Sequence, residues 1–449
     1  MDLVLTSEDD YENVALRHDP TFAGVEELIG VLKEFIRSKG LIIYGGLAID
    51  YALRLHGDKI YSDTLLQVDY DFLSPDNVEH AYDCADMFYA ILRNRDEDAA
   101  AGVRSINALH VKTMRVDIGD NHFLADVTYC PKVIFNSIPT LEYEGIKIIH
   151  PDMQRIDIHS SLSFPYDNAP MEVIFNRWKK DIKRFNLLTK YYPLTTSEMV
   201  TTDEYIEVPS TTFVLCGMNA YGMIYESLRR KYSDLPKDII APEGVHGGEK
   251  ARLFGSVYEI VHFAPEKCVE KLKLAHVKKY RPVINMIPET ITGMAEFGKV
   301  KIDITTGRLL STVSTEIDGK VYRIACVQYL LKQFLSAHHY SRMNGDDTNK
   351  YLQLYVSLIS LMEFERAKMQ ESTATVAQLS ITTYGADNVS LSKEVAMRRV
   401  FADIGQATAD YLPNNYYPAR RAEGVLRPQY DFSRNKIFAE SGEEEKNSD

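Results

Sequence analysis

The chain has 449 residues, of which 45% are hydrophobic and 26% charged, and it carries a formal net charge of −13. That length predicts two or three domains with hydrophobic cores, which excludes disordered chains, fibrous repeats and small disulfide scaffolds. The acidic balance argues against a nucleic-acid-binding protein, since such proteins usually carry excess positive charge. This objection weakens once the charge is located: residues 1–12 carry −5 and residues 440–449 carry −4, which leaves −4 for the 427 residues between them.

The cysteines and the N-terminal charges bear on the cellular compartment. The five cysteines are odd in number and form no Cys-x-x-Cys pair, so we expect buried, reduced thiols and neither disulfides nor a zinc site. The acidic first residues are the reverse of a secretory signal, and no apolar run approaches the roughly 20 residues of a membrane span. We therefore expect a soluble intracellular protein.

Hydrophobic spacing predicts an ordered series of elements in the first half. Residues 25–36 have helical periodicity, and Gly40 is placed to end this helix. A short β-type run at 41–44 leads into Gly45 and Gly46, after which a second helix is predicted as far as Gly57. The further elements are a strand at 67–73, a helix to about residue 93, strands at 122–129 and 145–149, and a helix at 171–191.

Two acids in the predicted strand at 67–73 suggest a metal site. Asp69 and Asp71 lie on one face of the predicted strand, about 6–7 Å apart along the chain. Their apolar neighbours indicate that the other face is buried, and paired carboxylates beside a core are costly unless a cation compensates them. Oxygen ligands of this kind suit Mg²⁺ or Mn²⁺. Asp126, on a separate strand, completes a set that can bridge two ions for displacement at phosphorus.

The two glycines supply a complementary feature. Without Cβ atoms, the backbone of Gly45 and Gly46 can approach a phosphate chain closely, and the following helix N-terminus offers N–H groups and a partial positive charge. Each signal alone also has an ordinary structural explanation: a tight turn for the glycines, an exposed edge pair for Asp69 and Asp71, and a hydrogen-bonded structural acid for Asp126. These features occur in one order, on predicted strands and at a strand–helix junction. Together they therefore indicate a metal and phosphate site more specifically than any one of them does alone.

A similar order of short apolar strands, a glycine turn and an acid occurs in the second half of the sequence. This similarity predicts an internal duplication. Residues 213–220 align with 41–48, so that Gly217 takes the place of Gly45. Residues 300–305 align with 123–128, which places Asp303 at the position of Asp126. Aligning 261–265 with the strand around Asp71 gives the second copy Ile260 and His262 in place of the acid pair.

These residues resemble a known family. Gly45-Gly46, Asp69-x-Asp71 and Asp126 look like the signature of the polymerase β-type nucleotidyltransferases. Within that superfamily, four stretches are similar to the poly(A) polymerase catalytic subunits of poxviruses and giant nucleocytoplasmic DNA viruses: YGGLAIDYALRLHG, VDYDFLSPDN, LADVTYCPK and RWKKDIKRFNLLTKYYP. The resemblance extends over about residues 25–435 and is sharpest from 41 to 193.

The resemblance implies a fold, a reaction and roles for the site residues. It implies template-independent addition of AMP from ATP to the 3′-OH of viral mRNA, with two Mg²⁺ or Mn²⁺ ions. Asp69, Asp71 and Asp126 are then metal ligands, with Asp126 near the primer 3′-OH, and Gly45 and Gly46 contact the triphosphate. Two features depart from the superfamily pattern: residues 47–68 make an unusually long separation between glycines and acids, and Gly46 stands where many members have serine.

The predicted fold class is α/β (α+β), a nucleotidyltransferase fold with a mixed sheet and flanking helices, followed by a degenerate second copy. The predicted domains are an acidic tail at 1–20, a catalytic domain at 21–200, a degenerate nucleotidyltransferase-like domain at 201–370, a C-terminal extension at 371–439 and an acidic tail at 440–449.

Three clusters of basic residues are candidates for contacts with single-stranded RNA, and solvated helix faces are the alternative for each. They are Arg177, Lys179, Lys180, Lys183, Arg184 and Lys190; Lys271, Lys273, Lys278, Lys279 and Arg281; and Arg420, Arg421, Arg427, Arg434 and Lys436, which alternate with Tyr416, Tyr417, Tyr430 and Phe432.

Two other functions stay open at this point. One is a different RNA nucleotidyltransferase such as a CCA-adding enzyme, and the other is a non-catalytic RNA-binding processivity subunit. The expected partners are ATP, an RNA 3′ end, and either a second copy of the chain or a viral processivity subunit, with no membrane. The resemblance implies the host cytoplasm or viral factory as the location, and packaging in the virion as an alternative.

Overall fold

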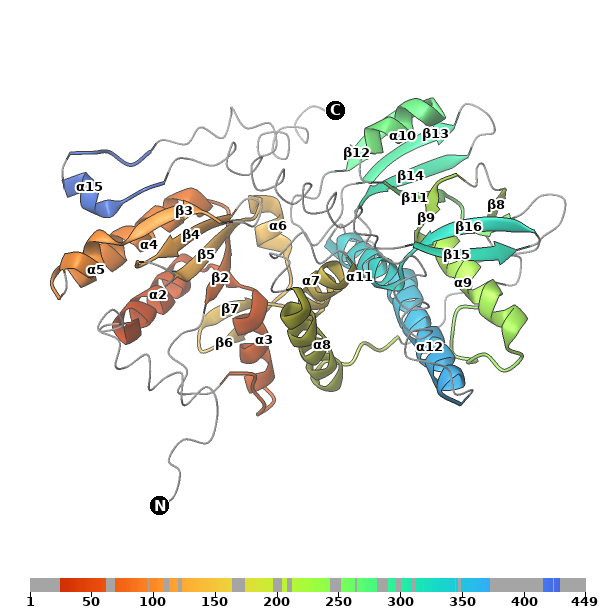
Figure 1. The fold of residues 1–449 in the computed structure, drawn as a ribbon, viewed down its shortest axis with the longest axis horizontal. Helices are drawn as coiled ribbons and strands as arrows, with labels where there is room; N and C mark the ends of the chain where they lie inside the picture. Colours follow the sequence, from red (N-terminus) through yellow and green to blue (C-terminus); the bar gives the residue numbers. More distant parts are fainter. Residues whose placement is uncertain are drawn as a thin grey trace, which may run out of the picture. The chain divides into compact units, whose positions relative to one another are not determined.

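The computed structural model of the chain has a mixed α/β architecture in two compact units (Figure 1). The first unit comprises Met1–Gln154, Asn186–Tyr192 and Arg399–Asp449, and the second comprises Arg155–Phe185 and Pro193–Arg398. The predicted fold class is confirmed. The structure describes residues 25–61, 69–95, 97–108, 113–119, 123–163, 174–196, 204–207, 212–242, 252–262, 265–280, 290–295, 300–307, 312–317, 319–343, 345, 349–371, 415–422 and 424–428.

A seven-stranded mixed sheet forms the centre of the first unit, with the strand order β3-β4-β5-β2-β1-β7-β6. The two central contacts differ in direction: β2 pairs parallel with β5 and antiparallel with β1. The strands are β1 (Ile42–Ile43), β2 (Tyr70–Ser74), β3 (Arg104–Asn107), β4 (Thr113–Asp117), β5 (Phe123–Tyr129), β6 (Thr140–Tyr143) and β7 (Ile146–Ile149).

Helices pack against this sheet and bury the apolar side of β2. Tyr70 and Phe72 are buried in the core, so the alternation of the strand directs Asp71 to the opposite face. Gly40 ends the first helix with φ of +62°, as predicted for a C-terminal glycine. The helices of this unit are α2 (Val25–Lys39), α3 (Gly45–Arg54), α4 (Asn77–Arg93), α5 (Glu97–Ala101), α6 (Lys132–Ser137) and α15 (Pro418–Ala422). Helices α7 (Pro151–Ser163) and α8 (Ile174–Tyr191) belong mostly to the second unit.

The second unit contains another seven-stranded sheet, in the order β12-β13-β14-β11-β9-β16-β15, and a two-stranded sheet of β8 and β10. Its strands are β8 (Tyr205–Glu207), β9 (Val214–Leu215), β10 (Arg252–Phe254), β11 (Tyr258–His262), β12 (Leu274–Tyr280), β13 (Thr290–Ala295), β14 (Lys301–Thr306), β15 (Thr312–Ile317) and β16 (Lys320–Ala325). Its helices are α9 (Gly217–Lys231), α10 (Pro265–Leu272), α11 (Val327–Met343) and α12 (Asn349–Glu371).

The two large sheets have the same topology, which confirms the internal repeat predicted from the sequence. With the two-stranded sheet set aside, the strands of both units follow the same chain order across the sheet. Every corresponding pair also has the same direction: for example, β9 pairs antiparallel with β11 as β1 does with β2, and β11 pairs parallel with β14 as β2 does with β5.

The predicted alignment of the acid-bearing strand was wrong. Ile260 pairs with Leu215 as Phe72 pairs with Ile43, so the counterpart of Asp71 is Glu259 and not His262. The error came from aligning two prolines with different roles. Pro265 is the first residue of α10, whereas Pro75 lies in the turn before α4.

Most predicted elements of the first half are present, with boundaries shifted by a few residues. Strands β3, β4 and β6 and helices α5, α6 and α7 were not predicted. All five cysteines are free and buried, as expected. No helix in the part of the chain that the structure describes is long and apolar enough to cross a membrane. The two acidic tails lie outside the described residues, and the domain boundaries stay predictions.

Candidate active site

The predicted acids meet on one face of the first sheet. Asp71 and Asp126 occupy directly paired positions on the parallel strands β2 and β5. Paired residues of neighbouring strands project to the same side, and the strands lie about 4.8 Å apart. Asp69 precedes β2 by one residue and is exposed, whereas Asp126 is only 5% exposed. The fold therefore brings together three carboxylates that are separated by up to 57 positions in the sequence.

The glycine turn lies against this acidic face. Gly45 begins α3 with φ of +73°, and a Cβ atom added there would stand 2.5 Å from Oδ2 of Asp71. The backbone N–H of Tyr44 donates to the carbonyl of Asp71 at 2.9 Å, which fixes the turn beside the strand. Gly46 is buried in the first turn of α3. A helix N-terminus, which favours anions, thus begins beside the acids.

Arg115 is part of the site and was missed in the sequence. It lies on β4 opposite Asp126, and its Nε and Nη2 donate to the two carboxylate oxygens at 2.8 and 2.6 Å. The pKa of Arg115 is raised, mainly by the hydrogen bond with Asp126 and further by the charges of Asp126, Asp69 and Asp71. The only available signal was the alternation of Met114 and Val116 with polar residues, in a segment that was not recognised as a strand.

A row of hydroxyl groups follows on the same face, two residues farther along the strands. Thr128 lies two positions after Asp126, and its Oγ1 is 2.8 Å from the Tyr44 hydroxyl and 2.7 Å from Oγ1 of Thr113. Because Tyr44 directly precedes Gly45, this contact attaches the glycine turn to β5 as well as to β2. No pattern in the sequence indicates this network.

The residues present suit a divalent cation in chemistry, although they are not already arranged as a metal cluster. Asp71 and Asp126 offer hard oxygen ligands from paired positions, with Asp69 on the same strand face. Within the described ranges, however, no three acid, histidine or cysteine side chains already form a group that could hold an ion. The contact between Arg115 and Asp126 accounts for part of this difference, because the guanidinium holds both oxygens of that carboxylate.

The corresponding position in the second unit has a different chemistry. Glu259 pairs with Asp303 as Asp71 pairs with Asp126, but Val257 and Thr292 stand at the positions of Asp69 and Arg115. The Glu259 side chain turns back to α9, where its Oε2 accepts the Met218 N–H at 2.6 Å. An added Cβ on Gly217 would overlap this carboxyl group.

Burial, and next the charge of Asp303, raise the pKa of Glu259 to about 8. The second unit thus keeps two of the three acid positions, and its own carboxyl group fills the space beside the glycine. In the first unit the Asp71 carboxyl group likewise lies against Gly45, but less closely: an added Cβ would stand 2.5 Å from it, and the corresponding distance in the second unit is shorter.

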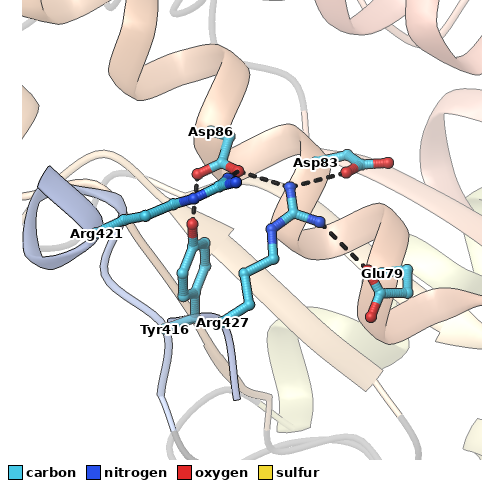
Figure 2. A network of polar contacts seen from close by, with 6 residues as sticks. All are labelled: Glu79, Asp83, Asp86, Tyr416, Arg421 and Arg427. Atoms are coloured by element: carbon cyan, nitrogen blue, oxygen red, sulfur yellow. Dashed lines mark hydrogen bonds and ion pairs between the residues drawn. The ribbon is translucent and has the colours of Figure 1, made fainter. Parts of the chain in front are cut away.

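The C-terminal basic cluster is largely committed to contacts within the first unit (Figure 2). Arg427 contacts Glu79, Asp83 and Asp86 on α4 at 3.2, 2.9 and 2.6 Å. Arg421 also reaches Asp86, at 2.8 Å. The structural explanation therefore holds for these two arginines, and Arg434, Lys436, Tyr430 and Phe432 lie outside the described residues.

The other two clusters keep exposed lysines. Lys179, Lys180 and Lys183 are exposed on α8. On α10 and β12, Lys271, Lys273 and Lys278 are exposed as well, whereas Arg281 lies outside the described residues. These side chains stay candidates for contacts with phosphate groups.

Comparison with known proteins places the site within a recognised family region. The family model described as the poly(A) polymerase catalytic subunit matches residues 30–168. The predicted resemblance is confirmed. This match contains Gly45, Gly46, Asp69, Asp71 and Asp126, together with Arg115, and it ends before the second sheet begins.

Individual relatives agree with this family match. The chain is 41% identical over 220 residues to a protein of African swine fever virus (isolate Pig/Kenya/KEN-50/1950) described as a poly(A) polymerase catalytic subunit, covering 49% of this chain and 44% of the relative. A protein of Acanthamoeba polyphaga mimivirus with the same description is 29% identical over 178 residues, or 39% of this chain and 28% of that protein. The chain thus matches less than half the length of these curated relatives.

A solved structure extends the similarity in fold over nearly the whole chain. The crystal structure of the Megavirus polyadenylate synthase matches with a TM-score of 0.66 over 98% of this chain and 91% of that one. Sequence identity in this comparison is 19%, so the match supports the fold.

Proposed function

We propose that the chain is a poly(A) polymerase catalytic subunit, which transfers AMP from ATP to the 3′-OH of RNA without a template. The observation that carries the proposal is the pairing of Asp71 with Asp126 on adjacent parallel strands, with the Gly45 turn in contact with Asp71. Acids and a helix N-terminus converge there, as transfer of a nucleotidyl group requires. The family match over residues 30–168 supports this reaction class.

The residues of the site have distinct proposed roles. Asp69, Asp71 and Asp126 hold divalent cations, Mg²⁺ or Mn²⁺, which when bound neutralise charge at the phosphates and activate the attacking hydroxyl. Asp126 lies nearest the primer 3′-OH. The backbone of Gly45 and Gly46 approaches the triphosphate, and the α3 N-terminus contributes N–H groups and a partial positive charge. The Tyr44–Thr128 contact holds the glycine turn in position.

The proposed partners follow from the same family. ATP and a single-stranded RNA 3′ end are the substrates, and the exposed lysines of α8 and β12 are the proposed RNA contacts. We also propose that the chain works as a homodimer or with a viral processivity subunit, in the host cytoplasm or viral factory. Light scattering of the purified protein, with size exclusion, tests the dimer.

One assay separates this function from the two alternatives. The full chain is incubated with a short RNA primer, Mg²⁺ or Mn²⁺, and each nucleoside triphosphate separately. We expect long tails from ATP alone. A few C and A residues added to tRNA ends identify a CCA-adding enzyme, and no incorporation under any condition identifies a non-catalytic RNA-binding subunit; either result contradicts the proposal.

A further inference from the structure

Arg115 occupies the side of Asp126 that faces the neighbouring strand, and it engages that carboxylate completely. The two bonds, from Nε to Oδ1 at 2.8 Å and from Nη2 to Oδ2 at 2.6 Å, form a bidentate pair. The cross-strand pairing of Arg115 with Asp126 fixes this geometry from the backbone. This pair uses one lone pair of each oxygen and places a positive charge beside Asp126, so a divalent cation that binds there is opposed by the guanidinium.

Three carboxylates act on the Arg115 guanidinium. Its pKa is raised by Asp126, Asp69 and Asp71, so three carboxylates share its field. The two partners also differ in solvent exposure: the Arg115 side chain is 25% exposed, and the Asp126 side chain is 6% exposed. A buried carboxylate that loses its partner is strongly destabilised, so a metal ion that replaces Arg115 would compensate this cost. Of the two side chains, Arg115 is the one with room to move.

The second unit shows what the same carboxyl pair does without an arginine. Thr292 stands at the position of Arg115, opposite Asp303. There, burial and the Asp303 charge raise the pKa of Glu259 to about 8, and Lys301 lies 3.9 Å from Asp303. In the first unit the guanidinium of Arg115 supplies a positive charge at the corresponding pair.

We infer that Arg115 is a displaceable counter-ion, which neutralises Asp126 in the metal-free protein and releases it when a divalent cation binds. The released guanidinium then contacts the negatively charged triphosphate. Arg115 is thus a positioning residue that couples metal binding to nucleotide binding. This inference rests on the proposed function, because it requires that Asp126 holds a metal.

The first test measures Mn²⁺ affinity of the full chain by electron paramagnetic resonance, without nucleotide or RNA. Because Arg115 competes with the metal for Asp126, we expect Arg115→Gln to bind Mn²⁺ about tenfold more tightly than wild type. The matched control is Arg104→Gln. Arg104 forms a similar cross-strand pair with Asp117 in the same sheet, at 2.8 Å, so its loss should leave Mn²⁺ affinity unchanged.

A second readout tests the contact with the triphosphate. We expect Arg115→Gln to raise KM for ATP about tenfold at saturating Mn²⁺, because a charge-assisted contact is lost, and Arg104→Gln to leave it unchanged. Equal Mn²⁺ affinity in wild type and Arg115→Gln overturns the counter-ion role, and an unchanged KM overturns the contact with ATP.

The test also covers the case in which Arg115→Gln does not fold. If Arg115→Gln is unfolded without metal and Mn²⁺ restores its thermal transition, the inference is supported. If metal does not restore it, Arg115→Lys is measured instead. This variant keeps the charge but loses the two-bond contact, so Asp126 should be released more easily and Mn²⁺ should bind more tightly than to wild type; equal affinity then overturns the inference. Failure of wild type itself to bind Mn²⁺ contradicts the proposed metal site, which distinguishes the two failures.

Discussion

At the scale of single residues, Gly45 is held by two separate constraints. Its φ of +73° lies in the left-handed region, and any Cβ there would contact the Asp71 carboxylate at 2.5 Å. Gly57, at the end of the same helical segment, has φ of +77°, but an added Cβ meets nothing within 4 Å. The two glycines therefore differ in their surroundings and share the same backbone requirement.

This comparison predicts the effect of Gly45→Ala. We expect Gly45→Ala and Gly57→Ala each to lower the free energy of unfolding by about 1 kcal/mol, because both place a side chain at positive φ. Only Gly45→Ala should also displace Asp71 and lower the rate of AMP incorporation by about tenfold or more. Primer extension and urea unfolding of both variants measure the two effects. Equal activity of the two variants would show that contact with Asp71 is unimportant.

Glu259 gives a second residue-level prediction, for pH dependence. Its pKa of about 8 in the folded chain lies above the ordinary value of 4.5, so folding takes up a proton between these pH values. The contribution of Glu259 to stability is therefore greatest at low pH and declines as pH rises from about 5 to 8. Glu259→Gln, which can still accept the Met218 N–H, removes this titration.

The prediction is checked by urea unfolding of wild type and Glu259→Gln at pH 5, 6, 7 and 8. The stability of the variant relative to wild type should increase steadily over this range. A constant difference between the two proteins would show that Glu259 titrates as an ordinary exposed acid.

At the scale of elements, the C-terminal segment Tyr416–Arg427 is an integral part of the first unit. Tyr416 is buried and forms a two-bond antiparallel bridge with Ser105, at the outer edge of the sheet, with both distances 2.8 Å. Its hydroxyl donates to Asp86, and Arg427 contacts three acids on α4 (Figure 2). The segment covers an edge strand and fixes α4, the helix that follows the Asp71 strand.

Removal of Arg427 should therefore weaken α4 and the sheet edge together. We expect Arg427→Ala to lower the free energy of unfolding by about 1–3 kcal/mol, because three acids lose a shared and half-buried partner. Hydrogen exchange should increase in α4 and β3. Arg420→Ala is the control: Arg420 is exposed and lies 4.6 Å over the Tyr417 ring, so we expect a change below about 0.5 kcal/mol. Similar exchange in the two variants would contradict this role of the segment.

The sequence predicts those helices and strands in which apolar residues recur at a regular spacing. Helices α2 and α4, strand β5 and the strand–glycine–helix order around Gly45 follow from helical spacing, alternation and turn residues. Pairing between distant strands does not leave such a local pattern. The contact of Arg115 with Asp126, the Tyr44–Thr128 hydroxyl pair and the match of Glu259 to Asp71 all depend on register across the sheet. They could be found only once the fold was known.

At the scale of the whole molecule, one topology carries two different sites. Both units place a glycine at the start of a helix against a carboxyl pair on adjacent parallel strands. Only the first adds Asp69 and Arg115, and only the first lies within the family match. The net charge of −13 is compatible with an RNA enzyme, because −9 of it belongs to residues 1–12 and 440–449. The central claim is that catalysis belongs to the first unit alone.

A matched pair of substitutions at equivalent positions tests this claim most directly. AMP incorporation into an RNA primer is measured for Asp71→Asn and Glu259→Gln in the full chain. We expect Asp71→Asn to lower the rate about 10³-fold or more, which corresponds to about 4 kcal/mol of transition-state stabilisation, and Glu259→Gln to retain the wild-type rate within about threefold. Normal extension by Asp71→Asn, or loss of extension in a folded Glu259→Gln, would contradict the account.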